Sequence, residues 1–190
     1  MLMSDKWNQR YAKAMGMPSA NPILALYKYL IPTQGQALDL ACGLGQNAFY
    51  LSKQGLNVSA WDISQVAIDA LNRHAERNKF AVTGHCLDAT QSWPQQEFDM
   101  IYVSAFLQRE LCPQIMASLK PGGILFYQTF NRVPLEGKPS NPKFLLAEGE
   151  LLDLFAGLTP LVYIDEQEHF DPQQQPSLAG KALLIAKKPL

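Results

Sequence analysis

The sequence lacks an excess of charge of either sign. Its 190 residues include 16 lysines and arginines and 17 aspartates and glutamates, for a net charge of −1. Binding to nucleic acid or to an anionic membrane usually requires a basic excess, so the totals favour neither kind of partner. The length and an apolar content of 47% suit one globular domain with its own core, spanning residues 1–190.

Cysteines and long apolar runs are also scarce. The three cysteines (Cys42, Cys86 and Cys112) are far apart and form no Cys-x-x-Cys pair, which argues against a disulfide framework or a zinc site. We therefore expect no metal. No apolar run reaches the roughly 18 residues of a transmembrane span. The N-terminal stretch MLMSDKWNQRYAKAM has no apolar signal-peptide core, so we expect a cytoplasmic protein without membrane contact.

What is present is a regular alternation of apolar strand-like runs and amphipathic helical segments. The patterns predict strands near 36–43, 57–64, 80–90, 98–106, 123–130, 161–170 and 181–188. They predict helices near 4–15, 22–30, 46–55, 64–78, 108–119 and 147–157, with a turn at KPGG, residues 120–123. This order indicates an α/β fold with a doubly wound, mostly parallel seven-stranded sheet, helices on both faces and a C-terminal antiparallel hairpin.

The stretch LDLACGLGQNAFYL, residues 38–51, carries the most informative motif. Gly43, Gly45 and Ala48 have the spacing of a dinucleotide-binding turn, Gly-x-Gly-x-x-Gly/Ala. Asp39, however, stands four residues before the first glycine, where a carboxylate would repel a pyrophosphate. S-adenosylmethionine has no phosphate and carries two positive groups, an ammonium and a sulfonium. Asp39 therefore favours that ligand over a dinucleotide.

Three further polar residues follow successive strands, where ligands of such sheets bind. Asp62, 19 positions after Gly43, can accept hydrogen bonds from ribose hydroxyls. Asp88 can accept from an adenine amino group, and Ser104 follows the fourth strand. Each aspartate taken alone can instead cap the helix that follows it. Together and in this order, the residues predict a nucleoside-binding site.

These residues resemble the motifs of class I S-adenosylmethionine-dependent methyltransferases, which have a Rossmann-like fold. LDLACGLGQN is similar to the first motif, AWDIS to the acidic end of strand two, LDAT to the adenine-contact motif and LKPGG to the turn before strand five. One departure is Asn47, where a third glycine is common. The resemblance implies S-adenosylmethionine as cofactor and these binding residues: Tyr11, Asp39, Cys42, Gly43, Gly45, Asn47, Asp62, Ile63, Asp88, Ala89 and Ser104.

A closer resemblance, to the small tellurite-resistance-type (TehB-like) methyltransferases, covers nearly the whole chain. It rests on WNQRY at 7–11, on residues 37–64 and on residues 127–155. In that group an N-terminal helix closes over the donor, so Trp7 and Tyr11 are pocket candidates; packing on the sheet edge is an equal alternative. The resemblance implies cap helices in 1–30, a donor-binding core in 35–130 and an acceptor loop in 131–146. Relatives often have an arginine in place of Gln46 and a histidine near the last hairpin, where this chain reads PSLAGKA.

The predicted function is methyl transfer from S-adenosylmethionine to a small-molecule acceptor, with a thiol or a chalcogen oxyanion as candidates. VSAFLQR after the fourth strand lacks the Asn/Asp-Pro-Pro-aromatic signature of nucleobase amine methylation. The acceptor-side candidates are Ser104, Arg109, Asn131, Arg132 and His169, and none stands out as a general base. For Arg109 and His169, an ordinary surface position is the alternative.

Two other classes remain open at this point. One is a non-catalytic module that binds S-adenosylmethionine, and the other is an NAD(P)-binding enzyme that uses GLGQNA. We expect a monomer or a homodimer and no nucleic-acid partner.

Overall fold

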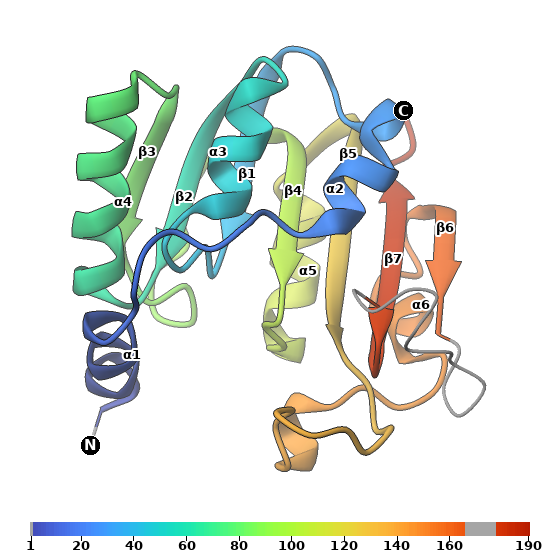
Figure 1. Cartoon of the computed structure of the whole chain (residues 1–190). Coiled ribbons are helices and arrows are strands. Elements are labelled where there is room, and N and C mark those ends of the chain that lie inside the picture. The colour runs from blue at the N-terminus through green and yellow to red at the C-terminus, as the bar shows by residue number, and fades with distance from the viewer. Residues whose placement is uncertain (1, 166–177) are drawn as a thin grey trace.

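The computed structural model describes residues 2–165 and 178–190 and contains one seven-stranded sheet of order β3-β2-β1-β4-β5-β7-β6 (Figure 1). The strands are β1 (Gly35–Leu40), β2 (Leu56–Asp62), β3 (Val82–Cys86), β4 (Phe98–Ser104), β5 (Leu119–Phe130), β6 (Thr159–Ile164) and β7 (Lys181–Lys187). Strands β1 to β5 pair in parallel, whereas β7 pairs antiparallel with both β5 and β6. The predicted fold class is confirmed, including the antiparallel pair at the C-terminal end.

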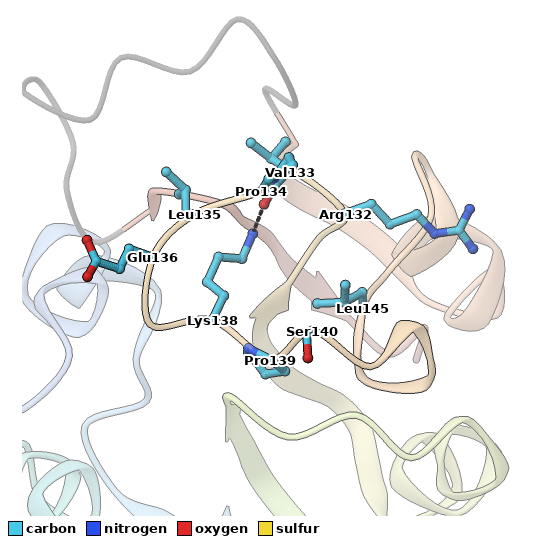
Figure 2. Close-up of a pocket in the computed structure, with 9 residues that line it drawn as sticks. All are labelled: Arg132, Val133, Pro134, Leu135, Glu136, Lys138, Pro139, Ser140 and Leu145. Atoms are coloured by element: carbon cyan, nitrogen blue, oxygen red, sulfur yellow. Dashed lines mark hydrogen bonds between the residues drawn. The ribbon is translucent and has the colours of Figure 1, made fainter.

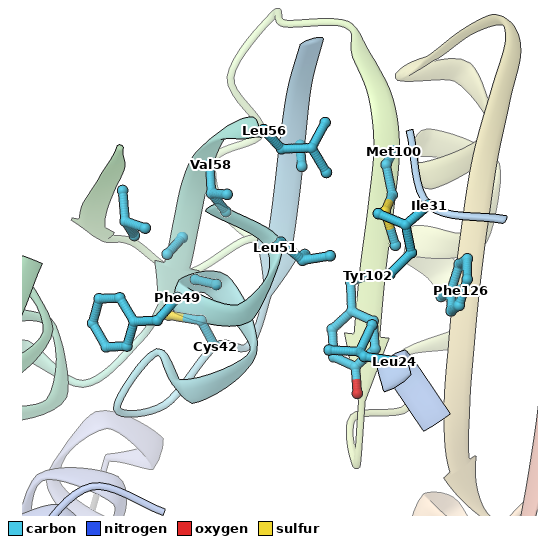
Figure 3. Close-up of a cluster of buried hydrophobic side chains, with 14 of the residues drawn as sticks. Leu24, Ile31, Cys42, Phe49, Leu51, Leu56, Val58, Met100, Tyr102 and Phe126 are labelled. Atoms are coloured by element: carbon cyan, nitrogen blue, oxygen red, sulfur yellow. The ribbon is translucent and has the colours of Figure 1, made fainter. Parts of the chain in front are cut away.

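Helices cover both faces of the sheet. They are α1 (Met3–Ala12), α2 (Pro22–Leu26), α3 (Gln46–Lys53), α4 (Gln65–Asn78), α5 (Cys112–Ala117) and α6 (Glu150–Leu154), with short 3-10 turns at Lys28–Leu30, Arg109–Leu111 and Pro142–Phe144. Helices α2, α3 and α4 bury their apolar residues on one face, and α5 and α6 on the other. Figure 3 shows the first of these layers, where Leu24 and Leu51 pack near Tyr102. Within the described residues, we find no helix with the length and apolarity needed to cross a bilayer.

Local sequence sets where the helices begin. Ser64 is the N-cap of α4, as predicted, because its side chain accepts a hydrogen bond from the Ala67 backbone N–H at 3.2 Å. Asn21 caps α2 in the same way, with Pro22 in the first turn. The predicted single helix over 108–119 is instead a 3-10 turn followed by α5. Pro113, which has no N–H to donate, is accommodated in the first turn of α5.

Several other predictions differ from the structure; the helix expected over 22–30, for example, is α2 followed by a 3-10 turn. KPGG does not form a turn before the fifth strand but lies inside β5, which begins at Leu119. The pairing of β5 with β4 shifts register there, and Gly122 (φ +77°) absorbs the irregularity. The helix predicted over 147–157 is the shorter α6, which begins after Gly149. Of the strand predicted over 161–170, β6 ends at Ile164, and the part from 166 onward lies outside the described residues.

The strand order indicates where in the sheet a ligand would bind. The chain runs from β1 outward to β2 and β3, then returns to the other side of β1 to form β4 and β5. The carboxyl ends of β1 and β4 therefore flank the point where the strand order reverses, which is where ligands bind in open α/β sheets. Ile23 and Leu24 of α2 are fully buried in the core. These two residues therefore belong to the core of the fold, and the cap predicted over 1–30 stays a prediction.

Candidate active site

The loop after β1 has a backbone that only a few residue types tolerate. Gly43 and Gly45 have φ values of +55° and +86°, and Ala41, the first residue beyond β1, has φ +56°. Ala105, directly after β4, has φ +54°. Left-handed non-glycine residues cost free energy and cluster at functional sites. Here both alanines stand at the strand ends where the topology predicts a ligand.

Asp39 supports this loop from inside the sheet. Gly45 precedes helix α3 as its N-cap residue and has no side chain to cap it. The Asp39 carboxylate accepts a hydrogen bond from the Ala48 N–H in the first turn. The second carboxylate oxygen, Oδ2, is buried and has no hydrogen-bond partner within the described residues. Burial raises the pKa of Asp39 to about 8; the Ala48 N–H opposes this rise and the nearby charge of Asp62 adds to it. An unpartnered buried carboxylate oxygen fits a cationic ligand group and does not fit a phosphate.

Asp62, at the end of β2, joins two loops. Its Oδ2 accepts from the Gly43 N–H at 2.9 Å, and its Oδ1 accepts from the Ser64 N–H at 2.9 Å. Burial raises its pKa, against the effect of these backbone donors. A carboxylate has about four lone-pair sites, so each oxygen keeps one for a ribose hydroxyl. Asp62 is therefore suited to hold the glycine loop and a ribose together.

The residues after β3 form a turn rather than a helix. Asp88 Oδ1 accepts from the Thr90 backbone N–H at 2.9 Å and from the Thr90 hydroxyl at 2.6 Å. The alternative that Asp88 caps a following helix is wrong, because residues 88–92 form only a turn. Ala89 packs against the core on the α5 face, and the carbonyl of Ile63 accepts from the Cys86 thiol at 3.6 Å. Asp88 stands beyond Asp62 in the order that an adenine next to a ribose requires.

Helix α1 lies against the loop after β1. The Tyr11 hydroxyl approaches Gly43, and the Trp7 and Tyr11 rings stack with centroids 5.8 Å apart. Asn8 anchors the helix because its Oδ1 accepts from the Ser64 hydroxyl at 2.7 Å and from the Val66 N–H at 3.3 Å. Figure 1 shows α1 beside the N-terminal end of α4. No pattern in the sequence pointed to this contact of Asn8.

Cys42 is 3% exposed and lies within the same loop. Its thiol points to the Gly43 carbonyl at 3.6 Å, and burial raises its pKa, so it remains a protonated packing residue. It contributes to the shape of the loop rather than to nucleophilic chemistry.

A second polar group, at the ends of β4 and β5, was missed by the sequence analysis. Asn21 donates through its backbone N–H to Asn47 Oδ1 at 2.8 Å, and through Nδ2 to Gln128 Oε1 at 2.6 Å and Ser104 Oγ at 3.4 Å. Gln128 is fully buried. The available signals were an asparagine before Pro22 and a lone amide in the apolar strand ILFYQTF.

Arg109 does not face the switch point. Its guanidinium donates to both carboxylate oxygens of Glu150, at 2.9 Å for Nη2–Oε2, and to the carbonyls of Lys143 and Leu145. These contacts hold α6 and the end of the 131–146 loop against the turn after β4. The structure thus gives Arg109 a role in holding the loop, and its role in orienting an acceptor stays a prediction.

Asn131 organises the 131–146 loop. Its Nδ2 donates to Asp165 at 3.1 Å, its Oδ1 accepts from the Val133 N–H at 3.2 Å, and the Lys138 ammonium donates to its carbonyl at 3.1 Å. Figure 2 shows Lys138 directed into the hollow of this loop, an open cavity of about 490 Å³ that Arg132 and Leu145 also line. His169 lies outside the described residues.

Comparisons with known proteins agree with this geometry. Residues 37–123 match a family model described as "Methyltransferase domain". The chain is 33% identical over 139 residues to the ubiquinone biosynthesis O-methyltransferase of Coxiella burnetii, covering 69% of this chain and 59% of that protein. It is 32% identical over 130 residues to the probable S-adenosyl-L-methionine-dependent methyltransferase TehB of Haemophilus influenzae, covering 63% of this chain and 44% of that protein. The chain therefore spans about half the length of these curated relatives.

Solved structures show the same fold. The crystal structure of TehB from Haemophilus influenzae superposes with a TM-score of 0.70 and 24% identity, covering 97% of this chain and 66% of that one. A TehB-like S-adenosylmethionine-dependent methyltransferase from Corynebacterium glutamicum gives a TM-score of 0.67 and 20% identity, with 97% of each chain covered.

The fold and the relatives together define the class. The chain belongs to the class I S-adenosylmethionine-dependent methyltransferases, with S-adenosylmethionine as its cofactor. Within that class it is a member of the TehB-like group. The interpretation as an NAD(P)-binding enzyme is thereby overturned.

Proposed function

We propose that this chain transfers the methyl group of S-adenosylmethionine to a small-molecule acceptor at the carboxyl ends of β1, β4 and β5. The observation that carries the proposal is the buried Asp39 Oδ2, which has no partner among the described residues and lies beside the glycine loop. A cation placed there would restore the missing interaction, and the donor carries an ammonium and a sulfonium.

Donor binding is assigned across the strand ends in the order of the sheet. We infer that Asp88 faces the adenine, Asp62 the ribose hydroxyls, and Asp39 the ammonium, with Gly43 and Gly45 giving the backbone a close approach. Tyr11 would cover the ligand from α1. The remaining candidates Cys42, Asn47, Ile63, Ala89 and Ser104 stay proposals as lining residues.

When bound, S-adenosylmethionine supplies an electrophilic methyl group on a sulfonium. Holding that group in line with a nucleophile supplies much of the acceleration, worth roughly 7–11 kcal/mol in favourable intramolecular cases. The Tyr102 hydroxyl on β4 stays protonated and offers no general base, because burial raises the pKa of Tyr102 far above neutrality. A soft nucleophile such as a thiol, which ionises readily by itself, suits this site better than an alcohol.

An oxyanion acceptor such as selenite or tellurite is the second candidate, and it needs cations to replace its water. Arg109 is paired with Glu150, and Lys138 donates to oxygens of Asn131 and Val133. The sequence of residues 166–177 contains no lysine or arginine. Arg132, which lines the cavity of the 131–146 loop, is the cation that an oxyanion would use, and the thiol remains our first candidate. We also propose that the chain acts on free small molecules, not nucleic acid, as a monomer or homodimer.

Two measurements test the proposal. Calorimetry should show binding of S-adenosylhomocysteine and none of NAD; the reverse pattern would sink the donor assignment. Formation of S-adenosylhomocysteine should then be followed with a panel of thiols and with selenite and tellurite. Turnover on thiols supports the proposed enzyme, whereas binding of the donor without turnover on any acceptor would favour the non-catalytic binding module.

A further inference from the structure

The polar residues on the α2–α3 face of the sheet form a row across three strands. In the sheet register, Asp39 of β1 pairs with Tyr102 of β4, and Ser104 of β4 pairs with Gln128 of β5. Side chains two residues apart on a strand share a face, so Tyr102 and Ser104 point the same way. The buried Asp39 Oδ2 in this row has no hydrogen-bond partner within the described part of the chain, whereas the Tyr102 hydroxyl lies close enough to Ser104 and Asn21 for them to lower the pKa of Tyr102 against the effect of burial.

Two backbone N–H groups identify the oxygen and the nitrogen in the side-chain amides of Asn21 and Asn47. The Ile23 N–H lies 3.2 Å from Asn21 Oδ1, and a backbone N–H can only donate. Asn21 Nδ2 is therefore the atom that faces Ser104 and Gln128. In the same way, the Asn21 N–H identifies the nearer atom of the Asn47 amide as Oδ1.

This arrangement decides what the row offers a ligand. The carbonyl oxygen of Asn47 is occupied by Asn21, so the Asn47 amide presents its N–H donors. Ser104 Oγ accepts from Asn21, so its hydroxyl keeps a hydrogen to donate. The result is a pair of neutral donors, Asn47 and Ser104, on the same side of the sheet as the unpartnered carboxylate oxygen of Asp39.

We propose that Asn21 is a positioning residue for the amino-acid end of S-adenosylmethionine: it sets Asn47 and Ser104 to donate to the ligand's carboxylate while Asp39 accepts from its ammonium. The inference rests on the proposed function, since it concerns the same site. A zwitterion needs donors and an acceptor in one place, and this is what the row provides. The strand order agrees with this assignment. The ribose and adenine candidates follow β2 and β3, on one side of β1, whereas Ser104 follows β4 on the other side.

The test compares two ligands that differ only in the carboxylate: S-adenosylhomocysteine and its decarboxylated analogue. Asn21→Asp keeps the shape and the oxygen that caps α2, but it replaces the donating Nδ2 by an acceptor and adds a negative charge. We expect S-adenosylhomocysteine to bind at least tenfold more weakly, with the decarboxylated analogue changed less than twofold. Asn78→Asp makes the same chemical change at the far end of α4, where Asn78 donates to the His74 carbonyl, and should alter neither affinity.

Asn21→Ser provides the second variant if the aspartate prevents folding. Serine also caps helices, but it is too short to reach Gln128. We again expect a selective loss for the ligand that carries the carboxylate, smaller than with aspartate. Equal losses for both ligands, or no loss for either, would overturn the role of Asn21. A wild-type chain that binds neither ligand would instead overturn the proposed function, which is a different result.

Discussion

The Tyr11 side chain occupies the space beside the Cα of Gly43, so that a Cβ built on this glycine would lie 2.6 Å from the Tyr11 hydroxyl oxygen. The contact joins α1 to the loop after β1, two segments 32 positions apart in the sequence. A substitution in α1 or in the loop after β1 should therefore alter the position of the other segment.

The first prediction concerns this contact. Gly43→Ala must adopt a left-handed backbone, which costs roughly 1–2 kcal/mol for a residue with a Cβ, and must also displace Tyr11. We expect S-adenosylhomocysteine to bind at least tenfold more weakly in calorimetry. Gly149→Ala is the matched control, because Gly149 has φ +74° but a Cβ there meets nothing within 4 Å. The control should lower the melting temperature without changing the affinity, and an equal affinity loss in both variants would refute the role of the contact.

The second prediction uses the raised pKa of Asp39, about 8 in the folded chain against an ordinary 3.8. Between these values the folded state keeps a proton that the unfolded state releases, so stability falls as pH rises, by at most ~1.4 kcal/mol per pH unit. An asparagine side chain at this position does not titrate, so the stability of Asp39→Asn relative to wild type should rise from pH 4 to pH 8 and level off above. Urea unfolding at several pH values measures this. A difference independent of pH would show that Asp39 is already ionised in the folded chain.

The third prediction concerns the ion pair between Arg109 and Glu150. The pair is partly exposed, with side-chain exposures of 33% and 21%, so screening reduces its contribution. Arg109→Ala should cost about 1–2 kcal/mol, since the two carbonyl contacts are lost as well. Glu150→Gln should lower the free energy of unfolding by less. The loss in the double variant should be smaller than the sum of the two single losses. The affinity for S-adenosylhomocysteine should stay within twofold, and a larger loss would show that the loop held by Arg109 also supports donor binding.

The fourth prediction concerns Asn8, which accepts hydrogen bonds from Ser64 and Val66 at the start of α4. Asn8→Ala removes both contacts and should release α1, because no residue of that helix is fully buried. Hydrogen exchange over residues 3–12 should accelerate several-fold, while exchange in β1 and β4 stays unchanged. Asn78→Ala serves as the control for the loss of an asparagine contact elsewhere. If α1 keeps its protection, Tyr11 and Trp7 hold the helix without Asn8.

The glycine loop after β1 and the sheet could be predicted from the sequence, because both depend on local patterns. Each signal lies within a few residues of the feature it predicts. The apolar runs predict the strands, the glycine spacing predicts the loop, and Ser64 predicts the start of α4. Asp39 was singled out by its charge alone, yet its contact with the Ala48 N–H follows from how α3 packs on β1. The prediction of one helix over 108–119 was wrong because α5 begins just before Pro113. This proline was a local signal that we did not weigh against the apolar pattern.

The partners of long polar side chains could not be predicted in this way. Asn21 reaches Gln128 across 107 positions, and Arg109 reaches Glu150 across 41. No periodicity in either segment points to the other, since such pairs form only once the sheet order is fixed. For this reason the contact of Arg109 with Glu150 was not foreseen, and Asn21 was not considered.

The position of β7 has a consequence for how the protein is made. β7 follows β6 in the chain but lies between β5 and β6, hydrogen-bonded to both. As the ribosome synthesises the chain from the N-terminus, β5 must wait with one edge unpaired until the last strand emerges. Until then, the unpaired edge of β5 can pair with the strands of other chains. A chain cut short before residue 181 would keep the edge of β5 that β7 normally covers unpaired.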